Sequence, residues 1–169
     1  MKYFMFGFFY LFTQPLLATT MVPLNLAELA EKADLIVEVS IETKTAAWQG
    51  QRIYTTSKAQ ILDTLKDQNP QRPKLIEIQS LGGVVGQIGQ KVHGAAKLET
   101  GKRYVVFLIE PDPGKYFVYG MEQGVIAVQH NDQGEQIAIP GHHTWQDGQP
   151  FNLNQFRKDI KNRHENTLP

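Results

Sequence analysis

Histidine is the residue type whose chemistry is most useful near neutral pH, and this chain has five histidines. His142 and His143 stand next to each other, and imidazole nitrogens are common ligands of zinc and related metals. Adjacent side chains in an extended segment point to opposite sides, so one metal ion seldom binds both. We therefore keep His142 and His143 as candidate metal ligands beside the plainer interpretation of a solvated polar loop. Conceivable companion ligands are His93, His130, Asp132 and Asp147.

Residues that serve as nucleophiles are missing or poorly spaced. The chain has no cysteine, which excludes a thiolate nucleophile, a disulfide framework and a cysteine-based zinc site. The carboxylate pairs, Glu28 with Glu31 and Glu38 with Glu42, have the spacing of a solvated helix or strand face and do not indicate a glycosidase. All three serines fall in predicted strands and outside any G-x-S-x-G motif: Ser40, Ser57 and Ser80. We expect no enzymatic activity and no cofactor.

A glycine-rich stretch covers residues 81–101 and has no clean hydrophobic period. Glycines let backbone N–H groups approach an anion, but this stretch lacks both the Gly-Lys-Ser/Thr and the G-x-G-x-x-G patterns of nucleotide sites. We interpret it as a long loop, and loops of this length are often contact surfaces. Together with the polar turn at residues 48–51, residues 84–94 are the expected binding surface. Its candidate residues are Trp48, Gly50, Val84, Val85, Gly86, Gln87, Ile88 and Gly89.

Alternating apolar residues predict the elements that carry these loops. Leu35, Val37, Val39 and Ile41 alternate with polar residues, which is typical of a strand with one buried face. The segment 104–109 is apolar on both faces and should be a central strand covered on both sides. The first of these strands is predicted over 35–44, and the other predicted strands are 53–65, 74–80, 115–119, 124–129 and 136–139. The predicted helices are 23–34, with a capping box of Asn25 and Glu28, and 153–162, with Asn152 as its cap.

The first 18 residues have the character of a secretory signal peptide. Lys2 precedes the apolar run Phe4–Phe12, Pro15 breaks the run, and the small residue Ala18 marks the cleavage point. The run is too short for a membrane helix of about 20 residues, so we expect no integral membrane segment after cleavage. A single β-barrel domain would then occupy residues 19–169, in the periplasm or secreted. An exported domain without cysteine is most typical of bacteria.

The charge balance argues against several partners. The chain has 17 basic and 17 acidic residues, and its formal net charge is zero. A neutral chain has no electrostatic reason to bind nucleic acid or an acidic membrane surface. We therefore expect no nucleic-acid partner.

Several segments together carry a resemblance to known proteins. They are Ala33-Asp34-Leu35-Ile36-Val37, Ile61-Leu62-Asp63-Thr64-Leu65-Lys66 and Gly101-Lys102-Arg103-Tyr104-Val105-Val106-Phe107-Leu108. This pattern resembles a widespread, poorly characterised group of exported bacterial proteins. More remotely, it resembles the netrin-like domain of tissue inhibitors of metalloproteases. The resemblance covers about residues 24–119 and implies a mainly β fold: a small OB-fold, netrin-like β-barrel with short N-terminal and C-terminal helices.

One departure limits what the resemblance implies about activity. Those inhibitors present an N-terminal cysteine to the protease metal, and this chain has no cysteine. The sequence therefore predicts an exported, non-enzymatic binding module whose partner is a protein or an envelope component. Two alternatives remain: a metal-dependent hydrolytic enzyme that uses His142, His143 and Asp147, and a protease inhibitor by netrin-like analogy.

Overall fold

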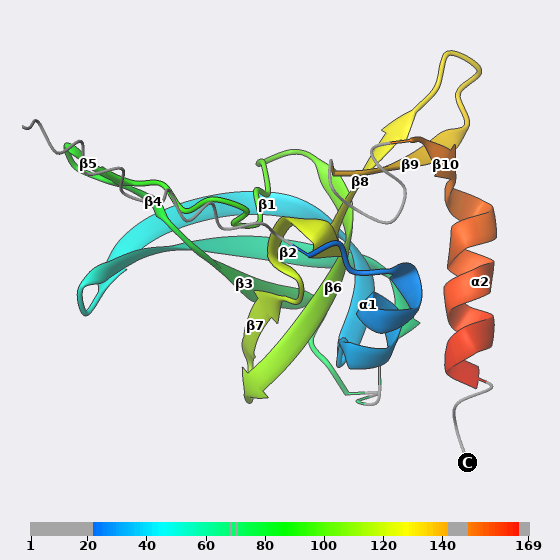
Figure 1. Cartoon of the computed structure of the whole chain (residues 1–169), viewed down its shortest axis with the longest axis horizontal. Helices are drawn as coiled ribbons and strands as arrows, with labels where there is room; N and C mark the ends of the chain where they lie inside the picture. Colours follow the sequence, from blue (N-terminus) through cyan, green and yellow to red (C-terminus); the bar gives the residue numbers. More distant parts are fainter. Residues whose placement is uncertain (1–21, 68, 70, 142–148, 166–169) are drawn as a thin grey trace, which may run out of the picture.

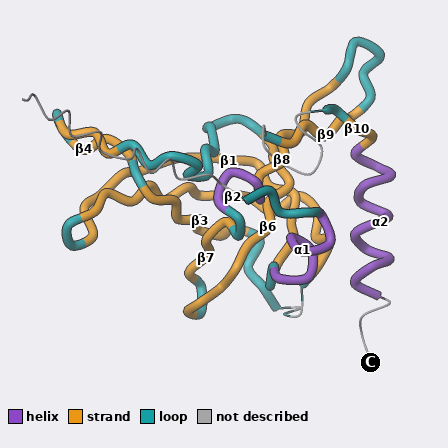
Figure 2. The backbone as a smooth tube through the Cα atoms, viewed as in Figure 1, coloured by secondary structure: helices purple, strands orange, loops and turns teal. Residues whose placement is uncertain are grey.

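A computed structural model describes residues 22–67, 69, 71–141 and 149–165. The fold is mainly β with one helix near each end of the described chain, as the sequence predicts (Figures 1 and 2). The predicted signal peptide and the candidate ligands His142, His143 and Asp147 lie outside the described residues. The elements are α1 (Leu26–Lys32), β1 (Leu35–Gln49), β2 (Arg52–Lys66), β3 (Leu75–Leu81), β4 (Gly83–Val85), β5 (Ile88–Gln90), β6 (Arg103–Asp112), β7 (Lys115–Val118), the 3₁₀ turn η1 (Met121–Gly124), β8 (Val125–His130), β9 (Gln136–Pro140), β10 (Phe151–Asn152) and α2 (Leu153–Glu165).

Five strands are paired in an order that returns to its starting strand. β1 pairs with β2 and β2 with β3, both antiparallel. β3 then pairs in parallel with β7, β7 pairs with β6, and β6 pairs with β1. β8 pairs with the first half of β6, and β9 and β10 extend the sheet from there.

The first hydrophobic core lies on one face of these paired strands. β1 contributes Leu35, Val37, Val39 and Ile41, and β6 contributes the alternate residues Tyr104, Val106 and Leu108. All seven are buried, which is the period-two pattern expected for one face of a strand. The alternation predicted for the first strand is confirmed.

A second core lies on the opposite face of the same two strands. Ile36 of β1 and Val105 and Phe107 of β6 are fully buried there. The two helices cover this face with Leu29 of α1 and with Leu153, Phe156 and Ile160 of α2. The prediction that residues 104–109 form a strand covered on both sides is confirmed. Both helices therefore lie at the end of the molecule away from the β4–β5 hairpin (Figure 1).

Local hydrogen bonds explain where the helices begin and end. The capping box is confirmed: the Glu28 N–H donates to the Asn25 side chain, and the Asn25 N–H donates to the Glu28 side chain, each over 2.9 Å. The Lys66 ammonium closes the other end of α1 by donating to the carbonyls of Ala30, Glu31 and Ala33. The predicted cap of α2 is also present, since Asn152 accepts a hydrogen bond from the Gln155 N–H over 3.0 Å.

Two predictions about the loops are wrong. Residues 81–101 do not form one irregular loop, because they contain the paired strands β4 and β5. Trp48 does not lie in a turn; it is in β1 and pairs with Ile53 of β2, and the turn is confined to Gly50 and Gln51. The strand predicted to end at Lys44 therefore continues to Gln49. Residues 45–49 do not alternate between polar and apolar side chains, because both faces of this part of the hairpin are largely exposed to water.

The helices in the described part of the chain are short. None of them is both long and apolar enough to cross a membrane.

Candidate ligand pocket

Two hairpins project from the molecule on the side away from the helices (Figure 1). We call residues 42–57, the far part of the β1–β2 hairpin, the arm. We call residues 82–97, which include the β4–β5 hairpin, the strap. The strap follows β3 directly and crosses the arm, because β4 contacts both β1 and β2.

Hydrogen bonds fasten the strap to the arm at Ile53. The Ile53 carbonyl accepts from the Gly82 N–H over 2.7 Å, and the Ile53 N–H donates to the Gln90 side chain over 2.7 Å. The Thr55 hydroxyl donates to the Gly82 carbonyl, also over 2.7 Å. Further along, the Gly94 carbonyl accepts from the Glu122 N–H over 2.8 Å, so the end of the strap is held on η1.

The close approach of the two backbones requires glycine at position 83. Gly83 has φ +145°, and a Cβ there would lie 2.6 Å from Thr55 Oγ1 and 3.0 Å from the Ala46 Cβ. A Cβ at 2.6 Å from an oxygen forces a shift of the Thr55 side chain or of the strap, and the φ of Gly83 is one that other residues rarely adopt. The glycine content of residues 81–101 thus has a packing cause here.

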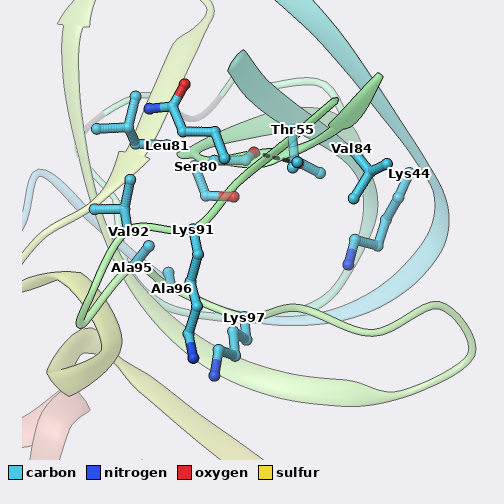
Figure 3. A pocket seen from close by; sticks show the side chains of 14 residues that line it. Lys44, Thr55, Ser80, Leu81, Val84, Lys91, Val92, Ala95, Ala96 and Lys97 are labelled. Carbon is cyan, nitrogen blue, oxygen red and sulfur yellow. Dashed lines mark hydrogen bonds between the residues drawn. The ribbon is translucent and has the colours of Figure 1, made fainter. Parts of the chain in front are cut away.

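Between arm and strap lies an open pocket of about 390 Å³ (Figure 3). Thr55 and Ser80 line it from β2 and β3, while Val84, Gly89 and Val92 line it from the strap. Three lysines also line it: Lys44, Lys91 and Lys97. The side chains of Lys91 and Lys97 leave the strap in the same direction, and Lys44 comes from the arm (Figure 3). The pocket therefore combines an apolar wall with three cations.

The three pocket lysines have no partner of their own. Within the described residues, no carboxylate forms an ion pair or a hydrogen bond with Lys44, Lys91 or Lys97. Lys44 does interact electrostatically with Glu99, whose pKa is lowered mainly by its hydrogen bond and ion pair with Lys102, 2.6 Å away, and to a smaller extent by Lys44. Among the described residues, the positive charge of the pocket is thus not neutralised by any ion pair.

A smaller hollow of about 220 Å³ adjoins this pocket. The two share Ser80, Leu81, Ala95 and Ala96 as lining residues. Around the smaller hollow the lining is mainly apolar and aromatic, with Tyr54, Phe117, Val118 and Met121. The pocket with the three lysines and the mainly apolar hollow are therefore neighbours along β3 and the end of the strap.

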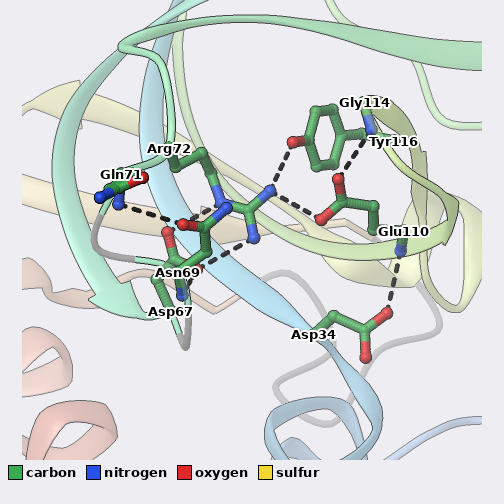
Figure 4. Close-up of polar contacts among 8 residues, drawn as sticks. All are labelled: Asp34, Asp67, Asn69, Gln71, Arg72, Glu110, Gly114 and Tyr116. Carbon is green, nitrogen blue, oxygen red and sulfur yellow. Dashed lines mark hydrogen bonds and ion pairs between the residues drawn. The ribbon is translucent and has the colours of Figure 1, made fainter.

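The Arg72 cluster, in contrast, is fully paired (Figure 4). Arg72 donates to Asp67 over 2.8 and 3.0 Å, to Glu110 over 2.7 Å and to the Tyr116 hydroxyl. Its guanidinium carbon also lies 5.2 Å from the centre of the Tyr116 ring, within cation–π range. The hydrogen bond with Asp67 is the main cause that raises the pKa of Arg72. With its donors engaged, Arg72 ties the loop after β2 to β6 and β7.

A second internal cluster joins α2 to the sheet. The Glu38 carboxylate of β1 is completely buried and accepts from both Arg103 and Arg157. Asp63 of β2 pairs with Lys161 of α2 over 3.1 Å. These charges are used within the fold, so the pocket lysines differ from them in being available to a ligand.

The residues predicted as the binding surface are only partly brought together. Val84 and Gly89 line the pocket. Trp48, Val84 and Ile88 stay exposed at the hairpins, with 47%, 67% and 56% of their surface accessible, and we call these three the tip residues. The remaining predicted residues lie in or beside the hairpin turns and do not line the pocket: Gly50, Val85, Gly86 and Gln87.

The pocket lysines were not found from the sequence. Lys44 and Lys97 are 53 positions apart, and each stands in a polar context that is ordinary for a solvated strand or loop. As for the metal hypothesis, no group of three or more metal-ligating side chains occurs among the described residues, which include His93, His130 and Asp132. His142 and His143 lie outside those residues, so the metal site stays a prediction.

Comparisons with known proteins add no family or relative. The chain matches no protein-family model, and no curated protein shows significant sequence similarity to it.

Proposed function

We propose that this protein is an exported binding module of the OB type, acting in the periplasm or outside the cell on a protein or envelope partner. The strand pairing supports the barrel, because five strands paired in a ring are what an OB-type barrel requires. The short helices on one side of that ring fit the netrin-like variant that the sequence resembles. The signal peptide remains the basis for export.

The tip residues are the observation that carries a binding role. Isolated exposed apolar residues are common on any protein, but Trp48, Val84 and Ile88 all lie on the two hairpins that project together from one end. Tryptophan and aliphatic residues on projecting loops are typical of contact surfaces, where their burial supplies most of the binding energy. We place the partner's contact at these hairpin ends.

Site-specific crosslinking tests this assignment. A photoreactive benzoylphenylalanine in place of Ile88 should give one discrete crosslinked product in cells that make the protein naturally. The matched control places the same group at Leu62, which is exposed to the same degree as Trp48 but lies outside both hairpins. Mass spectrometry of the product should identify the partner and show a mature chain that begins at Thr19.

Two results would contradict the proposal. An identical crosslinking pattern from positions 88 and 62 would mean that the hairpins make no specific contact. A mature chain that still contains residues 1–18 would remove the case for export. A further variant carries the photoreactive group in place of Trp48. Replacement of Val84 and Ile88 by serine should weaken its crosslink at least about tenfold, since each buried aliphatic side chain contributes about 1.5–3 kcal/mol.

A further inference from the structure

We propose that the pocket between arm and strap binds a small amphiphilic anion, with its acidic head at the three lysines and its apolar body in the adjoining hollow. This assignment goes beyond the proposed function, which places a macromolecular partner at the hairpin ends. Only Val84 belongs to both surfaces.

Charge is the first argument. Lys44, Lys91 and Lys97 surround one pocket, and within the described part of the chain they have no ion-pair partner. The charges of three lysines around one concave space create a positive potential that attracts an anion. In the Arg72 and Glu38 clusters the fold supplies acidic partners for its cations. The three pocket lysines have no such acidic partner among the described residues, and they differ from other unpaired exposed lysines, such as Lys74 and Lys158, in lining one pocket.

The second argument is the placement of a free hydroxyl. Ser80 lines both hollows and therefore lies at their shared border. Its hydroxyl makes no hydrogen bond among the described residues, whereas the neighbouring Thr55 hydroxyl is used to bind the Gly82 carbonyl. A hydroxyl at this junction can donate to an oxygen of the acidic head while the ligand's body extends past it.

Size and lining give the third argument. Pockets for small molecules usually measure about 300–1,000 Å³ and are mainly apolar with a few convergent polar groups. The lysine pocket, at about 390 Å³, fits this description, and the adjoining 220 Å³ adds Tyr54, Phe117 and Met121 as an apolar surface. An inorganic anion would leave that second hollow unfilled. A ligand with both an acidic head and an apolar body uses both parts.

A matched pair of fluorescent probes tests the proposal. Anilinonaphthalene sulfonate carries an acidic group, and N-phenylnaphthylamine has nearly the same aromatic body without the charge. The full mature protein should bind the sulfonate at about one site per chain and at least about tenfold more tightly than the amine. In the triple variant Lys44→Gln, Lys91→Gln, Lys97→Gln the sulfonate should bind at least about tenfold more weakly, while the amine should bind as before.

A second triple variant serves as the control for charge. Lys74→Gln, Lys115→Gln, Lys158→Gln removes the same number of charges from exposed positions that do not line the pocket. Its affinity for the sulfonate should stay within about twofold of the unmodified protein. Circular dichroism and a thermal scan establish that both variants are folded.

The possible outcomes distinguish binding in the pocket from attraction by overall charge and from binding of a protein segment. Equal weakening in the two triple variants would mean that only overall charge attracts the probe, and it would overturn the proposal. So would equal loss of both probes in the pocket variant. Displacement of the sulfonate by decanoate or decyl phosphate supports the proposal and identifies the acidic head. Displacement by a short acidic peptide but by neither amphiphile would overturn it in favour of a protein segment. None of these results depends on the crosslink at position 88.

Discussion

Among single residues, Glu38 contributes most clearly to holding the molecule together. Its carboxylate is completely buried on the face of β1 that α2 covers, and it accepts from Arg103 and Arg157 at once. A buried carboxylate is tolerated only when its charge is paired and its oxygens are hydrogen-bonded. Glu38 meets both conditions, and in doing so it links α2 to β1 and β6.

Glu38→Gln should therefore be strongly destabilising. The substitution leaves two arginines facing a neutral side chain, and removal of one partner from a buried ion pair usually costs about 3–5 kcal/mol. The free energy of unfolding, measured by urea titration, should fall by that amount. Glu77→Gln is the control, because its ion pair with Lys58 is exposed and should contribute less than about 1 kcal/mol. Equal losses in the two variants would contradict this role for Glu38.

The lowered pKa of Glu110 leads us to expect that the stability of the protein depends on pH. Burial would raise the pKa of Glu110, but hydrogen bonds from the Gly114 N–H and from Arg72 outweigh it and lower the pKa below 4.5. A carboxyl group with a lowered pKa stabilises the folded protein above pH 4.5. This contribution is lost as the pH falls through the pKa of the group in the folded protein. The stability of the unmodified protein should fall below pH 4.5 more steeply than that of Glu110→Gln. Parallel pH profiles would contradict this.

Sequence patterns identify residues whose partners are local. Asn25, Glu28 and Asn152 could all be assigned in advance, because a cap and its N–H groups lie within three positions along the chain. The pocket lysines could not, since the position of Lys44 and Lys97 around one pocket depends on how the strap crosses the arm. Ion pairs such as Glu38 with Arg157 are hidden for the same reason.

Among the elements, the strap shows how a glycine can decide where a hairpin lies. Gly83→Ala would place a methyl group 2.6 Å from Thr55 Oγ1, and we expect the strap to move off the arm. Hydrogen exchange should show faster exchange of the amides in residues 82–90 and little change in β1 and β6. We expect a loss of about 1–3 kcal/mol in the free energy of unfolding.

Gly86→Ala is the matched control for this substitution. Gly86 also has a positive φ, +60°, but a Cβ there would meet nothing within 4 Å. It should cost only the conformational strain of about 1–2 kcal/mol and leave exchange at residues 82 and 83 unchanged. Faster exchange there in both variants would mean that strain, and not the contact with Thr55, controls the strap.

Strand existence was easier to predict than strand length. The segments around Leu35, Tyr104 and Val125 have apolar residues that a buried face requires, and each is a strand. The alternation fails where a strand leaves the core, as in residues 42–49, and where it is too short to show a period, as in β4 and β5. The predicted strands therefore end where both faces of the strand become exposed to water.

At the scale of the whole molecule, the mainly β fold with a helix near each end of the described chain follows from the sequence. The pairing order does not, because the parallel contact between β3 and β7 joins segments that are separated by the entire strap and by β6. Such long-range pairing leaves no local signal in composition or periodicity. Our proposal of an OB-type barrel consequently depends on the strand pairing and on the resemblance together.

The burial of β1 and β6 on both faces has a consequence for how the protein unfolds. Because β1 and β6 have packed side chains on both faces, the loss of either core would expose a large apolar surface of these strands to water. The helices and the strands that carry the two cores should therefore melt in a single calorimetric transition. The arm and the β4–β5 hairpin contribute no residue to either core, so they can open below the midpoint of that transition. The parts that can open independently therefore lie at the end where we propose that ligands bind.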